Sequence, residues 1–114
     1  MHDTIALLKA RASEFAKRAR APATEAAYAG DWGDFERWCA ARDLASLPAA
    51  PETVALYLAD RSARLKVSTM QRRLAAIVVT HRRAGRRFDA DDPALTEVWR
   101  GIRRSCGTAR RGKR

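Results

Sequence analysis

Paired arginines occur near both ends of one helical stretch in the chain. The stretch 67–85 reads VSTMQRRLAAIVVTHRRAG, with Arg72 and Arg73 in its first half and Arg82 and Arg83 near its end. A helix that only filled a hydrophobic core would not need these charges. Arginine side chains donate forked hydrogen bonds that fit guanine edges and phosphate, and small hydroxyl residues bond to phosphate or bases. These residue types predict binding to a nucleic acid.

The same stretch divides into an inward and an outward face. We predict an apolar inward stripe that consists of Met70, Leu74, Ile77, Val78 and His81. The predicted outward residues are polar or basic: Ser68, Thr69, Arg72, Arg73 and Arg83. The start of a helix offers free N–H groups and a positive dipole end, which both suit phosphate. A helix about 25 Å long could lie in a major groove, and the alternative is that the arginines only solvate the surface.

We find no residue pattern that is typical of a catalytic site. Two histidines, His2 and His81, are too few for a metal site, and a satisfied core histidine is favoured for His81. The sequence has no GxSxG motif, no glycine-rich phosphate loop before a helix and no paired carboxylates in an apolar setting. Asp89, Asp91 and Asp92 are interpreted as loop and capping residues. We therefore expect a binding protein with no cofactor, no metal and no small-molecule substrate.

Positive charge is concentrated in the second half of the chain. Residues 61–114 contain 16 Lys or Arg against 4 Asp or Glu, a net charge of +12. Residues 1–60 contain 7 against 9, a net charge of −2, so the whole chain carries +10. Charge of one sign on part of a surface favours a polyanionic partner. We favour nucleic acid over the alternative of a solvated basic face with a disordered tail.

Length and composition are consistent with one cytoplasmic domain. The 114 residues, of which 46% are hydrophobic, suffice for a single core. No apolar run approaches the roughly 20 residues of a membrane span, and the N-terminal sequence lacks the pattern of a signal peptide. Cys39 and Cys106 have no Cys or His neighbour at metal-ligand spacing. We interpret them as buried free thiols in a reducing cytoplasm, with a disulfide as the less favoured alternative.

Apolar residues recur at three- and four-residue steps and predict five helices without strands. The helices are expected at about 3–18, at about 23–41, after Pro51, at 67–85 and after Asp92. The first helix has an apolar stripe that consists of Ile5, Leu8, Ala12, Phe15 and Ala19. Brief connections between short helices predict an all-α fold, a compact bundle of four to five helices.

The second predicted helix is expected to supply the aromatic centre of the core. Its stripe consists of Tyr28, Trp32, Phe35, Trp38 and Cys39. Gly30 and Gly33 lie on other faces, and a helical glycine costs about 1 kcal/mol relative to alanine. We therefore expect something to approach the backbone closely there, and we favour a neighbouring helix over a ligand.

Capping signals mark the ends of the stretch 67–85. Ser68 is the predicted N-cap, and Gln71 follows three residues later in a capping-box pattern. Gly85 supplies the predicted C-terminal stop. After Gly107 the chain is polar and basic, which predicts a linker or tail.

Four sequence blocks and the spacing between them follow a known pattern. The blocks are TEAAYAGDWGDFERWCAARDL at 24–44, LPAAPETVALYLADRS at 47–62, VSTMQRRLAAIVVTHRRAG at 67–85 and DDPALTEVWRGIRR at 91–104. Over about residues 20–106 the chain resembles the N-terminal core-binding domain of tyrosine recombinases, the phage-integrase family that includes the Cre-type enzymes. The resemblance implies a SAM-like helical bundle that clamps double-stranded DNA together with a separate catalytic domain, in DNA recombination and integration.

The resemblance also implies which residues contact DNA. In that family the second and fourth helices lie in or beside the major groove. By position the implied contacts are Thr24, Ala26, Ala27 and Gly30, then Ser68, Thr69, Gln71, Arg72 and Arg73, with Arg82 or Arg83 at the backbone. At 25–27 this chain has Glu-Ala-Ala where relatives often carry basic or longer residues, which leaves phosphate contact through Thr24. The outer faces of 4–18 and 94–105 would contact neighbouring protomers on DNA.

The chemistry of the family requires a tyrosine nucleophile with arginines, a lysine and a histidine or tryptophan in a following domain. Tyr28 and Tyr57 lie on core stripes, and the residues 81–84 do not reproduce the His-x-x-Arg spacing of the family. We therefore expect no enzymatic activity from this chain. Residues 1–106 are expected to form the DNA-binding domain, and 107–114 a basic linker or tail toward a catalytic domain that the chain lacks.

Two other functions stay open at this point. One is a helical protein-interaction domain whose basic half meets an acidic protein. The other is a transcription regulator with a helix-turn-helix, because the connection RLKV before the stretch 67–85 is short enough.

Overall fold

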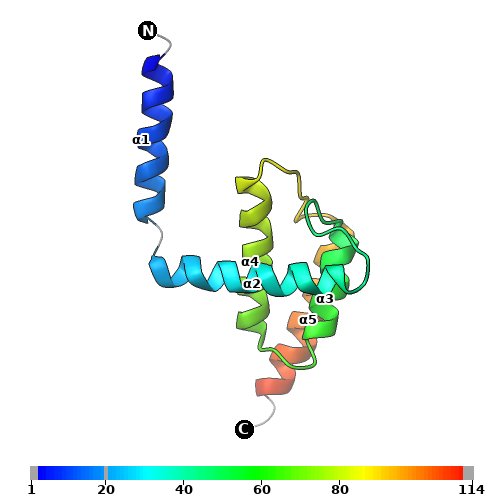
Figure 1. Cartoon of the computed structure of the whole chain (residues 1–114). Coiled ribbons are helices and arrows are strands. Elements are labelled where there is room, and N and C mark those ends of the chain that lie inside the picture. The colour runs from blue at the N-terminus through cyan, green and yellow to red at the C-terminus, as the bar shows by residue number, and fades with distance from the viewer. Residues whose placement is uncertain (1–2, 20, 112–114) are drawn as a thin grey trace.

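The computed structural model describes residues 3–19 and 21–111, and the side chains as far as Cys106. In this part of the chain it contains helices and no strand, which confirms the predicted all-α class (Figure 1). The helices are α1 (Asp3–Ala19), α2 (Pro22–Ala40), α3 (Pro51–Arg61), α4 (Val67–Arg83) and α5 (Pro93–Arg111). None of them has both the length and the apolar character of a membrane span.

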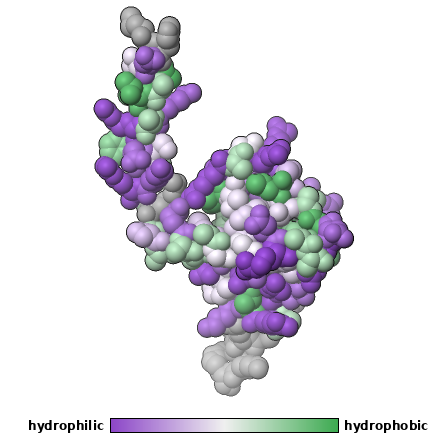
Figure 2. Space-filling model, viewed as in Figure 1, coloured by the Kyte–Doolittle hydropathy of each residue, from purple (hydrophilic) through white to green (hydrophobic). Residues whose placement is uncertain are grey.

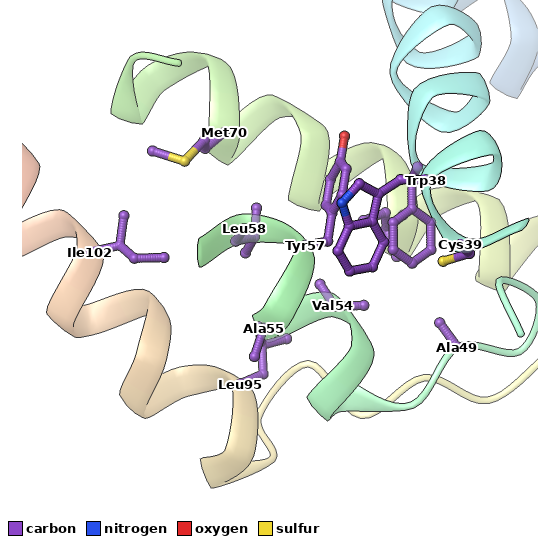
Figure 3. Packing of buried hydrophobic residues seen from close by; sticks show 12 residues of the cluster. Trp38, Cys39, Ala49, Val54, Ala55, Tyr57, Leu58, Met70, Leu95 and Ile102 are labelled. Carbon is purple, nitrogen blue, oxygen red and sulfur yellow. The ribbon is translucent and has the colours of Figure 1, made fainter. Parts of the chain in front are cut away.

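The helices α2 to α5 form the bundle. Helix α2 crosses α4, α3 packs along α5, and α4 contacts both α3 and α5 (Figure 1). The core between them contains Phe35, Trp38, Cys39, Val54, Tyr57, Leu58, Met70, Ile77, Leu95 and Ile102 (Figure 3). The ring of Phe35 lies edge-on to Tyr57 at 4.9 Å, and Trp38 lies edge-on to Tyr57 at 5.4 Å. The predicted aromatic stripe of α2 is thus confirmed for Phe35, Trp38 and Cys39, with Trp32 packed at its margin. It is wrong for Tyr28, which is half-buried and lies outside the core cluster.

His81 is a satisfied core histidine, as predicted. Its side chain is buried, and its Nδ1 lies 2.8 Å from the carbonyl oxygen of Ile77. Its Nε2 accepts a hydrogen bond of 2.9 Å from the backbone N–H of Ala49. These two bonds require the neutral tautomer that carries its proton on Nδ1. The histidine therefore fastens the loop before α3 to α4.

Helix α1 departs from the expected packing. It stands away from the bundle and contacts no other described helix, so all of its residues are exposed (Figure 1). The predicted stripe of Ile5, Leu8 and Phe15 therefore enters no core within this chain. Ala21 has an extended backbone and Pro22 begins α2, in keeping with the preference of the residue before a proline for extended geometry. Figure 2 shows its apolar side chains exposed among charged ones.

The ends of α4 confirm one prediction and correct another. Gly85 has a left-handed φ of 69°, its N–H bonds to the carbonyl of Arg82, and the Arg86 N–H bonds to that of His81. This pair of bonds is the Schellman stop that the glycine predicted. The N-cap prediction for Ser68 is wrong: Lys66 occupies the cap position with an extended backbone, and no side chain caps the helix. The Met70 N–H already bonds to the carbonyl of Lys66, which places Ser68 inside the first turn.

The favoured prediction that a neighbouring helix closely approaches the glycines of α2 is also wrong. A Cβ at Gly30 would have nothing within 4 Å, and one at Gly33 would meet only the side chain of Arg37. The other helices pack instead against the face of α2 that carries Asp31, Phe35 and Trp38.

Helix α5 begins as predicted, after Asp92, but it ends beyond Gly107, where a linker or tail was predicted. The carboxylate of Asp92 accepts the Ala94 N–H at 2.8 Å, which confirms its interpretation as a cap. The helical backbone continues to Arg111, past Gly107, since one glycine inside a helix costs only about 1 kcal/mol. The assignment of 107–114 to a connection toward another domain stays a prediction. Cys39 and Cys106 are free thiols, with Cys39 buried and Cys106 half-buried, and burial raises the pKa of Cys39.

Candidate nucleic-acid interface

Acidic residues of α2 face arginines of α4 where the two helices cross. The first pair joins Arg72 to Asp31. The Arg72 Nε donates to Asp31 Oδ2 at 2.7 Å, and its Nη2 donates to Oδ1 at 3.0 Å. The Asp31 side chain is 4% exposed, whereas the Arg72 side chain is 48% exposed. The hydrogen bonds and the charge of Asp31 raise the pKa of Arg72, so this guanidinium is charged and oriented at the surface.

Asp34, one turn further along α2, is the centre of a second cluster. Its Oδ2 accepts hydrogen bonds from Arg73 Nη1 at 2.5 Å, from the Tyr57 hydroxyl at 2.6 Å and from Arg61 Nε at 3.1 Å. Arg73 also donates to the Tyr57 oxygen at 2.9 Å. Its Nε has no hydrogen-bond partner among the described residues and lies 3.6 Å from Asp31 Oδ1. Arg73 thus links the two clusters.

This environment perturbs the pKa of both acids in the second cluster. Burial acts to raise the pKa of Asp34, but hydrogen bonds from Tyr57 and Arg61 and the charges of Arg61 and Arg73 lower it below its usual value. Burial and the hydrogen bond to Asp34 raise the pKa of Tyr57 to about 12. The phenol is therefore a neutral donor at neutral pH and Asp34 is an ionised acceptor. Such an arrangement stabilises the contact of α2 with α3 and α4 and offers no activated nucleophile.

The end of α4 meets the start of α2. The Arg83 guanidinium makes a fork with Glu25, with hydrogen bonds of 3.1 and 3.0 Å. Beside it lies a hollow of about 560 Å³ between the two helices, whose lining includes Thr24, Tyr28, Val79, Arg82 and Arg83. The structure thereby brings Thr24, predicted to contact phosphate, together with both arginines from the end of α4.

Several arginines near the end of α4 have no acidic partner among the described residues. The guanidinium groups of Arg82, Arg86 and Arg87 are exposed and form no ion pair or hydrogen bond with another described side chain. These groups are wholly available to an external anion, whereas the guanidinium groups of Arg72, Arg73 and Arg83 are partly occupied by carboxylates.

The predicted contact residues fall into three groups. Exposed residues are Thr24, Ala26, Gly30, Ser68, Gln71, Arg72, Arg82 and Arg83. Half-buried residues are Ala27, Thr69 and Arg73. Ser68, Gln71 and Arg72 lie together on the first turns of α4, whereas Gly30 does not line the hollow.

The acidic partners Glu25, Asp31 and Asp34 were not predicted from the sequence. A signal for Asp31 was present, because it lies four residues before Phe35 on the buried stripe of α2. A buried carboxylate is almost always paired with a basic group. The position of Asp31 on the buried stripe therefore predicts a basic partner on another element.

Comparison with known proteins relates the chain to an integrase/recombinase. No protein-family model matches the chain. The chain is similar to an integrase/recombinase xerD homolog from Selenomonas ruminantium, with 38% identity over 109 residues. The aligned region covers 93% of this chain and 32% of that relative, so the chain spans about a third of its length. This similarity supports the relationship to tyrosine recombinases that the four sequence blocks indicated.

Proposed function

We propose that this chain binds duplex DNA as a non-catalytic, N-terminal module of a site-specific tyrosine recombinase or integrase. The observation that carries the proposal is the exposed face of α4. From its first turn to its last, this helix presents Ser68, Gln71, Arg72 and Arg82 to solvent. The similarity to the integrase/recombinase homolog points to the same role.

The dimensions of α4 fit a major groove. A helix of 17 residues is about 25 Å long, and the groove of B-DNA is about 12 Å wide. Ser68 and Gln71 would bond to bases or phosphates near the start of the helix. Arg72 would read a base edge, and Arg82, with Thr24 across the hollow, would contact the phosphate backbone.

The half-buried Arg73 has a different part in this proposal. Its Nη1 is engaged by Asp34 and Tyr57, and its side chain is 18% exposed. It would hold the first turns of α4 against α2 and α3 and thereby support the residues that contact DNA. Electrostatic attraction to the duplex would come mainly from the unpaired Arg82, Arg86 and Arg87.

Further partners of the proposed module are its own catalytic domain and neighbouring protomers on DNA. Helix α1 supports contact with neighbouring protomers, because it packs on no other described helix. Its large apolar side chains are exposed: Ile5, Leu7, Leu8 and Phe15. The same observation favours the second candidate function, a protein-interaction domain that docks through α1 and does not depend on DNA.

The salt dependence of DNA binding separates the two functions. We would measure fluorescence anisotropy of a labelled mixed-sequence duplex with the 114-residue chain across a salt series. Counterion release gives a log–log slope of roughly −0.9 per phosphate contacted, so a slope of about −3 or steeper is expected. A flat response, or no binding at about 50 mM salt, would contradict DNA binding and favour the protein-interaction function.

A further inference from the structure

The guanidinium of Arg72 is held along one edge and open along the other. An arginine side chain has five N–H donors. The fork to Asp31 uses the Nε donor and one Nη2 donor. The other three, on Nη1 and Nη2, have no hydrogen-bond partner among the described residues. An outer edge with two parallel donors matches the O6 and N7 acceptors of guanine.

Asp31 is a fixed support for that edge. Its side chain is 4% exposed, and it belongs to the same face of α2 as the fully buried Phe35. On its other side Arg73 Nε lies 3.6 Å from Oδ1, so the carboxylate is enclosed by two guanidinium groups. The buried Asp31 carboxylate cannot move into solvent together with Arg72. The Arg72 side chain therefore extends from a buried carboxylate to the exposed surface. The long side chain is therefore ordered before any ligand arrives.

We propose that Asp31 is a positioning residue that orients Arg72 to read one guanine in the major groove, an inference that rests on the proposed DNA-binding role of α4. A free arginine at this place would act mainly as a mobile cation toward phosphate. The bond to Asp31 neutralises much of its long-range attraction and fixes the direction of its free donors. Asp31 thus lowers affinity for any duplex and raises selectivity for a sequence with guanine at one position.

The test begins with the sequence preference of the 114-residue chain. Selection from a random duplex pool should yield a site with a required guanine. Anisotropy then compares that duplex with one in which the guanine is replaced by adenine. In the Asp31→Asn variant, preference for the guanine should fall at least about fivefold, since a bidentate contact contributes about 1–3 kcal/mol of discrimination. Binding to a mixed-sequence duplex should stay equal or become tighter, because one negative charge is removed.

Three further variants complete the design. Glu36→Gln makes the same change of charge at an exposed position of α2, and it should keep the guanine preference. Arg72→Lys keeps the positive charge without the fork, and it should lose the preference as Asp31→Asn does. Arg72→Ala should lose both the preference and part of the affinity.

The outcomes distinguish this inference from the function on which it rests. Circular dichroism of each variant establishes that it is folded. A folded Asp31→Asn protein with full guanine preference would overturn the positioning role, and so would selection that yields no required guanine. If Arg72→Ala also leaves binding unchanged, the first turns of α4 are not the DNA-binding face.

Discussion

At the scale of single residues, the carboxylates of α2 determine which arginine side chains of α4 are paired and how they are oriented. Arg72 is oriented by Asp31, Arg73 is engaged by Asp34 and Tyr57, and Arg83 is paired with Glu25. The position of Arg72 off the apolar stripe identified it as a surface residue. It could not identify the partner, because Asp31 is 41 residues away in sequence and local patterns carry no information about that contact.

The cluster around Asp34 predicts a dependence of stability on pH. The pKa of Asp34 in the folded protein is lower than its ordinary value of 3.8. The carboxylate therefore contributes stability that is fully present above the unfolded pKa and is lost as pH falls through the folded pKa. We expect the free energy of unfolding to decrease between about pH 5 and about pH 2, and to decrease less in Asp34→Asn.

Urea denaturation at several pH values measures this difference. Asp34→Asn should also be less stable at pH 7 by about 1–3 kcal/mol, because Arg61, Arg73 and Tyr57 lose a charged acceptor. Glu52→Gln, at an exposed position of α3, is the matched control and should follow the wild-type protein. Parallel pH profiles for wild type and Asp34→Asn would show that the cluster does not stabilise the fold.

At the scale of elements, the helix ends show which local signals can be interpreted from sequence. Gly85 and Asp92 were predicted correctly because a glycine stop and an aspartate cap act through bonds within a few residues. Ser68 was misplaced because the extended backbone of Lys66 starts α4 earlier, without any side-chain cap. The departure of α1 was also missed, since an apolar stripe does not specify where its partner surface lies.

The end of α2 gives a prediction about stability. Asp43 has a left-handed φ of 56°, which costs an L-residue roughly 1–2 kcal/mol and glycine much less. Asp43→Gly should therefore stabilise the protein by about 0.5–1 kcal/mol in thermal or urea unfolding. Gly85→Ala, at a φ of 69°, is the converse change and should destabilise it by about 1 kcal/mol. Destabilisation by Asp43→Gly would mean that the aspartate side chain contributes more than its backbone strain costs.

At the scale of the whole molecule, charge and packing divide the chain into distinct surfaces. The bundle of α2 to α5 holds the hydrophobic core, α4 presents polar and basic side chains, and α1 presents exposed apolar ones (Figure 2). The sequence predicted the bundle because helical periodicity records which residues are buried. It did not predict how α2 crosses α4, because that crossing depends on packing between distant segments. The acidic side chains that shape the candidate site belong to this crossing.

We propose that α4 and the start of α2 together form the DNA-binding face. The most direct measurement is a titration of the ¹⁵N-labelled chain with an unlabelled duplex, followed by backbone amide chemical shifts. We expect the largest changes at Ser68, Gln71 and Arg72, with further changes at Thr24 and Arg82. Changes confined to α1 or α3, with the amides of α4 unaffected, would contradict it.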